Sequence, residues 1–285
     1  MHPATRTDTS PAPGSRRPAT LAVAAGVAML AVMVLPFPAA GLWPGGGYSD
    51  VSTLGAAVGR GLVRFWDAGT ADLSPELAAS VAFWTRFHVV KAVLAVPLLV
   101  TSVLLGLALW RECVRSVGRG RRAWFAAAGV LEAPLVLLAV LLVVANVQGA
   151  IVPLSSVLGL VDVRDPDPAL ATAVRGIKDS LETSPEVPAP PTMTRLVEDF
   201  AAYHRVMVGL GAMVTVGLVL VAARLWRRSR RTGSAQSGQS ARWVRLGSAT
   251  AVLVVAASFA LITAANLSTA AHPAPALLGF FQGSS

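Results

Sequence analysis

The stretch FHVVKAVLAVPLLVTSVLLGLALW, residues 87–110, has only two side chains that can carry charge, His88 and Lys91, and both lie within its first five residues. A run of about 18 or more apolar residues is long enough to cross a hydrocarbon layer about 30 Å thick as an α-helix. The stretch therefore predicts a membrane-spanning helix. It also poses the question of what His88 and Lys91 do at one end of it.

The rest of the chain repeats this pattern. Hydrophobic residues make up 54% of the sequence and charged residues 14%, whereas a soluble domain has roughly a quarter charged residues. The composition excludes an ordinary soluble protein and predicts an all-α membrane protein with five transmembrane helices. The predicted spans are residues 20–42, 87–110, 125–151, 203–225 and 246–268.

Arginine is distributed unevenly between the segments that connect the spans. The 111–124 loop contains five arginines and one acid, and the 226–245 loop contains six arginines and no acid. The other two connections are net acidic, so the chain follows the positive-inside rule for a bacterial cytoplasmic membrane. We therefore attribute the net charge of +9 to topology. Membrane lipids and other membrane proteins are the expected partners, and nucleic acid is not. The predicted cytoplasmic segments are 1–19, 111–124 and 226–245, and the predicted outside segments are 43–86, 152–202 and 269–285.

The first span permits a second interpretation. The sequence SRRPATLAVAAGVAML, residues 15–30, places twin arginines before an apolar run, as in Tat-type export signals. Pro18 and Ala19 stand where such signals usually carry a more apolar residue, and the apolar run is slightly long for a signal core. We expect an uncleaved signal anchor.

Residue usage limits the chemistry that the chain can perform. Cys113 is the only cysteine, which excludes an intrachain disulfide and a thiolate metal cluster. No phosphate-loop, dinucleotide, zinc-protease or nucleophile-elbow motif is present. We expect neither enzymatic activity nor a resident cofactor or metal. Two lysines against 22 arginines make the composition resemble that of multi-pass membrane proteins from high-GC actinobacteria, which implies no particular activity.

Parts of the sequence occur twice. ANVQGAIVPLSSVLG (145–159) aligns without gaps with ANLSTAAHPAPALLG (265–279), at an offset of 120 residues. FHVV (87–90) aligns with YHRV (203–206) at an offset of 116 residues, which also aligns the two Leu-Trp-Arg sequences downstream. Shared His, Asn, Pro and Trp are informative in apolar helices, so we predict a tandem duplication with both units entering the membrane from the same side.

Two outside segments have helical periodicity. In residues 167–182, Leu170, Val174, Ile177 and Leu181 recur on one helical face, after Asp167 as the predicted N-cap. Residues 50–66 show a weaker version of the same pattern. We expect these amphipathic helices to form a small cap over the outer end of the bundle.

The duplication selects a candidate polar cluster. His88 recurs as His204 and Asn146 as Asn266, at similar predicted depths near the outer surface, with His272 as a further candidate member. Each His can pair with the Asn of the neighbouring helix, or both can point toward a shared ligand. We favour local pairing, because polar ties between helices are common in membranes.

Two charged residues within the predicted spans, Lys91 and Glu132, are not repeated. We expect the protein to be a binding or scaffold component with an outer polar cluster. One alternative is an electron carrier in which His88 and His204 hold a haem b, which needs their ligating nitrogens about 4 Å apart. The other alternative is a transporter of a small solute or ion that works around Glu132 and Lys91.

Overall fold

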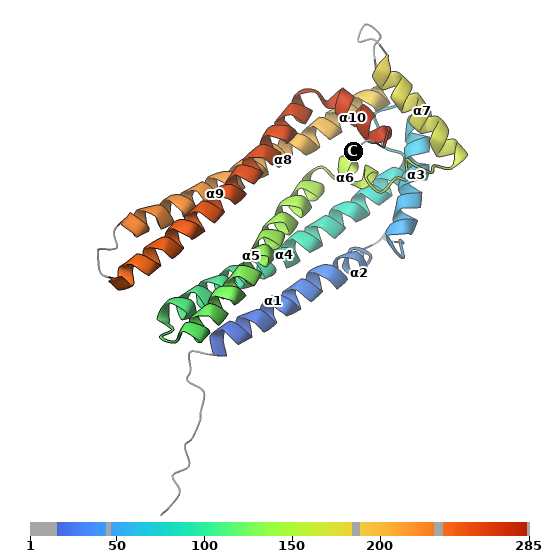
Figure 1. Ribbon diagram of the computed structural model, residues 1–285. Helices are drawn as coiled ribbons and strands as arrows, with labels where there is room; N and C mark the ends of the chain where they lie inside the picture. The colour runs from blue at the N-terminus through green and yellow to red at the C-terminus, as the bar shows by residue number, and fades with distance from the viewer. Residues whose placement is uncertain (1–15, 44–46, 184–188, 231–235, 284–285) are drawn as a thin grey trace, which may run out of the picture. The chain divides into compact units, whose positions relative to one another are not determined.

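A computed structural model describes residues 16–43, 47–183, 189–230 and 236–283, so the predicted cytoplasmic tail lies outside the described residues except for 16–19. All the regular secondary structure in these ranges is helical (Figure 1). The helices are α1 Arg16–Val34, α2 Pro36–Ala40, α3 Val51–Ala68, α4 Pro75–Arg115, α5 Arg119–Ile151, α6 Pro153–Leu158, α7 Pro168–Glu182, α8 Pro191–Arg230, α9 Gln236–Ala271 and α10 Pro273–Phe281.

Five helices, α1, α4, α5, α8 and α9, are long and apolar enough to cross a membrane. They expose large apolar side chains: Val93 on α4 is 64% exposed, Leu131 on α5 is 78% exposed and Leu261 on α9 is 72% exposed. Such surfaces suit contact with lipid and would be unfavourable in water. The predicted all-helical fold with five candidate spans is therefore confirmed by helix length and composition.

The chain divides into two compact units, each of which is described by itself. The first consists of residues 1–34 and 93–142, and the second of residues 35–92 and 143–285. In the first unit, Leu105 and Leu109 of α4 pack with Phe125 of α5.

The second unit contains a long helical hairpin. Helices α8 and α9 run side by side along their length (Figure 1). Gly211 of α8 permits this close approach, since a Cβ atom at this position would overlap the Thr263 hydroxyl of α9. The short helices α6 and α10 contact α8 of this hairpin and contribute residues to the candidate site.

The predicted outside helices are present as α3 and α7, which pack against each other. Asp50 caps α3 by accepting a hydrogen bond from the Thr53 backbone N–H at 2.8 Å, and this bond lowers the pKa of Asp50. Asp167 caps α7, as predicted. Their apolar faces are buried in one core together with α6, α10 and the first turns of α4 and α8. We call this group of helices the cap; its buried residues include Leu54, Val58, Leu62, Phe65, Leu170, Val174, Ile177, Leu196, Leu277 and Phe281.

Helices α6 and α10 begin in the same way. Each starts at a proline directly after a long helix, where the preceding residue breaks the helical conformation. The residue before α6, Val152, has φ −127° and ψ 73°, and the residue before α10, His272, has φ −131° and ψ 66°. The similar angles give the two short helices similar directions relative to the long helices that precede them. Residues 273–281, which we expected in an outside tail, are thus helical.

Candidate functional site

Two histidines of the second unit are each bonded to an asparagine on a neighbouring helix. Nδ1 of His88 on α4 lies 2.9 Å from Oδ1 of Asn146 on α5. Nδ1 of His204 on α8 lies 2.7 Å from Oδ1 of Asn266 on α9. An amide oxygen can only accept, so each Nδ1 donates the hydrogen bond. The local pairing favoured from the sequence is present at both positions.

The second ring nitrogen of His88 is also bonded. Nε2 lies 3.0 Å from Oγ of Ser156 on α6, and Nε1 of Trp84 donates to the same oxygen at 3.0 Å. With Nδ1 protonated, a neutral His88 ring accepts at Nε2 from the Ser156 hydroxyl, whose oxygen accepts from Trp84. The resulting chain runs from Trp84 through Ser156 and His88 to Asn146 and uses both ring nitrogens. We call this arrangement the His88 network.

Gly149 makes room for this network. A Cβ atom at this position of α5 would lie 2.5 Å from Nε2 of His88. Only glycine lets the imidazole approach the helix so closely without a shift of the ring. No local sequence signal distinguishes Gly149, Trp84 or Ser156, because their roles depend on where α6 lies.

The aromatic neighbours of the two histidines are similar. Trp84 lies edge-on to the His88 ring with centroids 4.8 Å apart, and Phe200 lies edge-on to the His204 ring at 4.6 Å. Such edge-to-face contacts fix the ring orientation and stabilise it modestly.

The two sites differ in the side chains that can form a hydrogen bond with Nε2 of the histidine. At the offsets found in the sequence, Trp84 corresponds to Phe200, Ser156 to Ala276 and Gly149 to Thr269. Phe200 and Ala276 offer no hydrogen-bonding side-chain group. Within the part of the chain that the structure describes, no hydrogen bond joins Nε2 of His204 to another residue.

A pocket of about 410 Å³ adjoins His204, and we call it the His204 pocket. The polar side chains that line it are those of Ser155, Ser156, Tyr203, His204 and Thr269. Among the described residues, the Ser155 Oγ is buried without a hydrogen-bond partner. Buried polar atoms are usually paired, so an unpaired hydroxyl beside a pocket indicates a place for a ligand or water. Apolar side chains form most of the remaining wall: Leu158, Phe200, Ala276, Leu277 and Phe280.

The other candidate residues are not among those that line this pocket. His272 is exposed, and its side chain does not line the pocket. The Lys91 ammonium lies 5.1 Å from the centre of the Phe87 ring, in a cation–π contact. Glu132 is 8% exposed and belongs to the other unit, where its Oε1 has no hydrogen-bond partner in the described residues.

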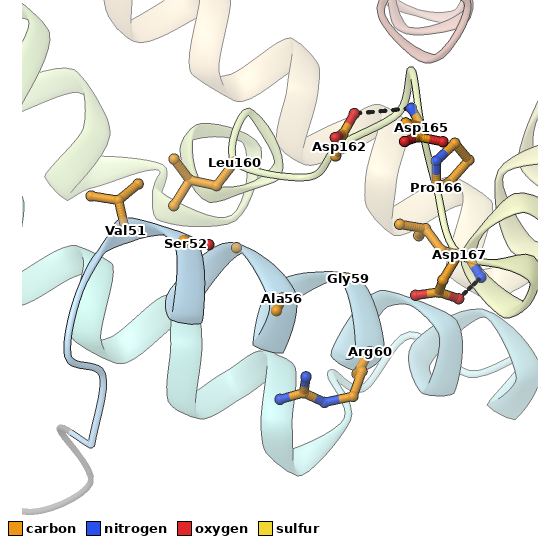
Figure 2. Close-up of a pocket in the computed structure, with 12 residues that line it drawn as sticks. Val51, Ser52, Ala56, Gly59, Arg60, Leu160, Asp162, Asp165, Pro166 and Asp167 are labelled. Carbon is orange, nitrogen blue, oxygen red and sulfur yellow. Dashed lines mark hydrogen bonds between the residues drawn. The ribbon is translucent and has the colours of Figure 1, made fainter.

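A second pocket, of about 670 Å³, lies between α3 and the segment that leads into α7 (Figure 2). Two of the three aspartates that line it have partners: Asp162 accepts from the backbone N–H groups of Arg164 and Asp165, and Asp167 caps α7. Arg60 points away from them in Figure 2 and binds Glu76. These acids therefore stabilise a turn and a helix end.

The arrangement argues against haem binding by His88. Both of its ring nitrogens are bonded within the protein, so iron could bind only after the Ser156 or Asn146 bond broke. Among the described residues there is also no group of three His, Cys, Asp or Glu side chains that could hold a metal ion.

Comparison of the chain with protein-family models, with curated proteins and with solved structures gave no match in any of the three.

Proposed function

We propose that this protein is a multi-pass component of a bacterial cytoplasmic membrane that binds a ligand in the His204 pocket. Its amino terminus and both arginine-rich loops lie in the cytoplasm, and the cap lies outside. The arginine distribution supports this orientation, because short loops rich in arginine stay on the cytoplasmic side.

The proposal includes a tandem duplication. The two His–Asn bonds and the similar backbone angles at Val152 and His272 support it. Matching polar contacts and helix breaks at constant sequence offsets are less common by chance than matching apolar residues. Duplication gives two related positions, of which one can keep a structural role while the other acquires a ligand.

One observation carries the binding function: the open nitrogen of His204 beside the His204 pocket. A volume of about 410 Å³ lies within the range of small-molecule sites, which are mainly apolar with a few polar groups. The His204 pocket has this character, whereas the equivalent nitrogen of His88 is bonded to Ser156.

Native mass spectrometry of the full-length protein, released from membrane nanodiscs, tests the proposal. We expect the wild type to retain a bound small molecule and His204→Leu to lose it. His272→Ala is the matched control, since this exposed histidine precedes α10 and lies outside the pocket, and it should retain the ligand. Equal occupancy in the wild type and His204→Leu would contradict the proposed site.

The orientation has its own test. Reporter fusions in the 112–122 and 228–244 loops should report the cytoplasm, and fusions in residues 160–200 and at Ser285 should report the outside. A cytoplasmic signal at Ser285 would refute the topology with five spans.

A further inference from the structure

The hydrogen-bonding state of His204 is set by two successive contacts. Asn266 donates from Nδ2 to the carbonyl of Ile262 at 2.8 Å, which turns its Oδ1 toward His204. Because Oδ1 only accepts, Nδ1 of His204 carries the ring proton. In the neutral imidazole Nε2 is then an acceptor with a free lone pair.

A ligand that satisfies Nε2 of the neutral ring must therefore donate a hydrogen bond. The His88 network shows which group does this within the same protein: a hydroxyl, supplied by Ser156, occupies the corresponding nitrogen at 3.0 Å. The corresponding residue beside His204 is Ala276, which lines the pocket and leaves the place of that hydroxyl open.

The other residues that line the pocket indicate the chemical character of the rest of the ligand. Ser155, which also lines the pocket, has a buried hydroxyl without a hydrogen-bond partner among the described residues. Phe200, Leu277 and Phe280 offer apolar surface to a hydrocarbon body. Among the residues that the structure describes, no arginine or lysine lines the pocket, so none of them offers a fixed positive charge to a carboxylate or phosphate there.

We infer that the His204 pocket binds a neutral, lipid-soluble molecule with a free hydroxyl group, an alcohol or a phenol, which donates a hydrogen bond to Nε2 of His204. This inference rests on the proposed function and specifies its ligand class. Binding forms no covalent bond: the ligand hydroxyl takes the place that Ser156 holds at His88.

Photoaffinity labelling tests the ligand class with the full chain in nanodiscs at neutral pH. The probe is a para-alkylphenol whose alkyl chain carries a diazirine, and the readout is the labelled peptide, which we expect to contain α10. Four competitors are compared: para-octylphenol, decanol, para-octylanisole and para-octylbenzoate. The anisole lacks the donor, and the benzoate carries a negative charge.

We expect the phenol and decanol to compete at concentrations about tenfold lower than the anisole and the benzoate, as loss of one buried hydrogen bond predicts. Competition by the phenol alone would identify an aromatic ligand, and competition by decanol alone an aliphatic one; either result supports the hydroxyl class. Equal competition by the anisole, or stronger competition by the benzoate, would overturn the hydroxyl class of ligand. The proposal that the His204 pocket binds a ligand would then still hold.

Substitutions separate the ligand class from the proposed function. Ala276→Ser restores an internal hydroxyl at the position equivalent to Ser156, so we expect it to lower α10 labelling about tenfold. His204→Leu removes the acceptor and should do the same, and His272→Ala should label like the wild type. Labelling that is unchanged in both Ala276→Ser and His204→Leu would overturn the proposed function together with the ligand class.

Discussion

His88 and His204 have similar partners at Nδ1 and similar aromatic neighbours, but they differ in the surroundings of Nε2. Each histidine donates from Nδ1 to an asparagine on the next long helix, and each lies edge-on to an aromatic ring four residues earlier in the chain. At His88 a serine on α6 completes the hydrogen bonds, whereas at His204 the equivalent residue is alanine and a pocket adjoins the ring. The Ser156 hydroxyl, together with the Trp84 N–H and the space at Gly149, thus distinguishes the fully bonded His88 from His204.

Removal of each histidine should show the largest difference. We expect His88→Leu to lower the free energy of unfolding by about 2–4 kcal/mol, because it removes the hydrogen bonds of the ring to Asn146, which is 4% exposed, and to the Ser156 hydroxyl. His204→Leu strands only the Asn266 oxygen, which is less buried, and should cost about 1 kcal/mol. Equilibrium unfolding in mixed micelles measures both values, and equal losses would show that the two sites do not differ in this way.

Substitution of Gly149 tests the space around the His88 ring. Gly149→Ala places a methyl group against Nε2 and should displace the ring from Ser156, at a cost of about 1–3 kcal/mol of unfolding free energy. Thr269→Ala, at the equivalent position beside His204, should change stability by less than about 0.5 kcal/mol. The same unfolding assay applies. A neutral Gly149→Ala would mean that the ring can move without loss of its bonds.

A reciprocal exchange of the hydroxyl should give the smallest effects. Ser156→Ala leaves Nε2 of His88 and the Trp84 N–H without their partner and should cost about 1–2 kcal/mol. In ligand-free protein, Ala276→Ser should raise stability by up to about 1 kcal/mol, because it provides a donor for His204. A loss of stability in both variants would show that α10 does not present residue 276 to His204 as α6 presents Ser156 to His88.

The sequence predicted much of the fold, because apolar periodicity and helix caps are local signals. The start of α7 was expected from Asp167 as its N-cap, and the structure agrees. The His–Asn pairs were predictable because both residue types recur at constant offsets. His272 shared their predicted depth, yet the structure leaves it exposed at the start of α10.

Other features could be read only from the tertiary structure. Trp84 and Ser156 resembled ordinary residues of an apolar helix and a connecting segment, and nothing local linked them to His88. The His204 pocket was equally hidden, because its lining comes from α6, α8, α9 and α10. Pairings between such distant segments depend on the directions of helix breaks, which residue types alone do not specify.

The sequence by itself determined that the chain forms five apolar helices and that each of two such helices carries a histidine able to reach an asparagine. Helix length, apolar composition and recurrence are sufficient for these conclusions. Only the tertiary structure decided which histidine has both ring nitrogens hydrogen-bonded within the protein. Ser156 is 68 residues from His88 in the chain, and they meet because the chain turns at Val152 and Gly149 leaves space for the ring. Beside His204 the chain turns in the same way, but it presents Ala276 and leaves the nitrogen open.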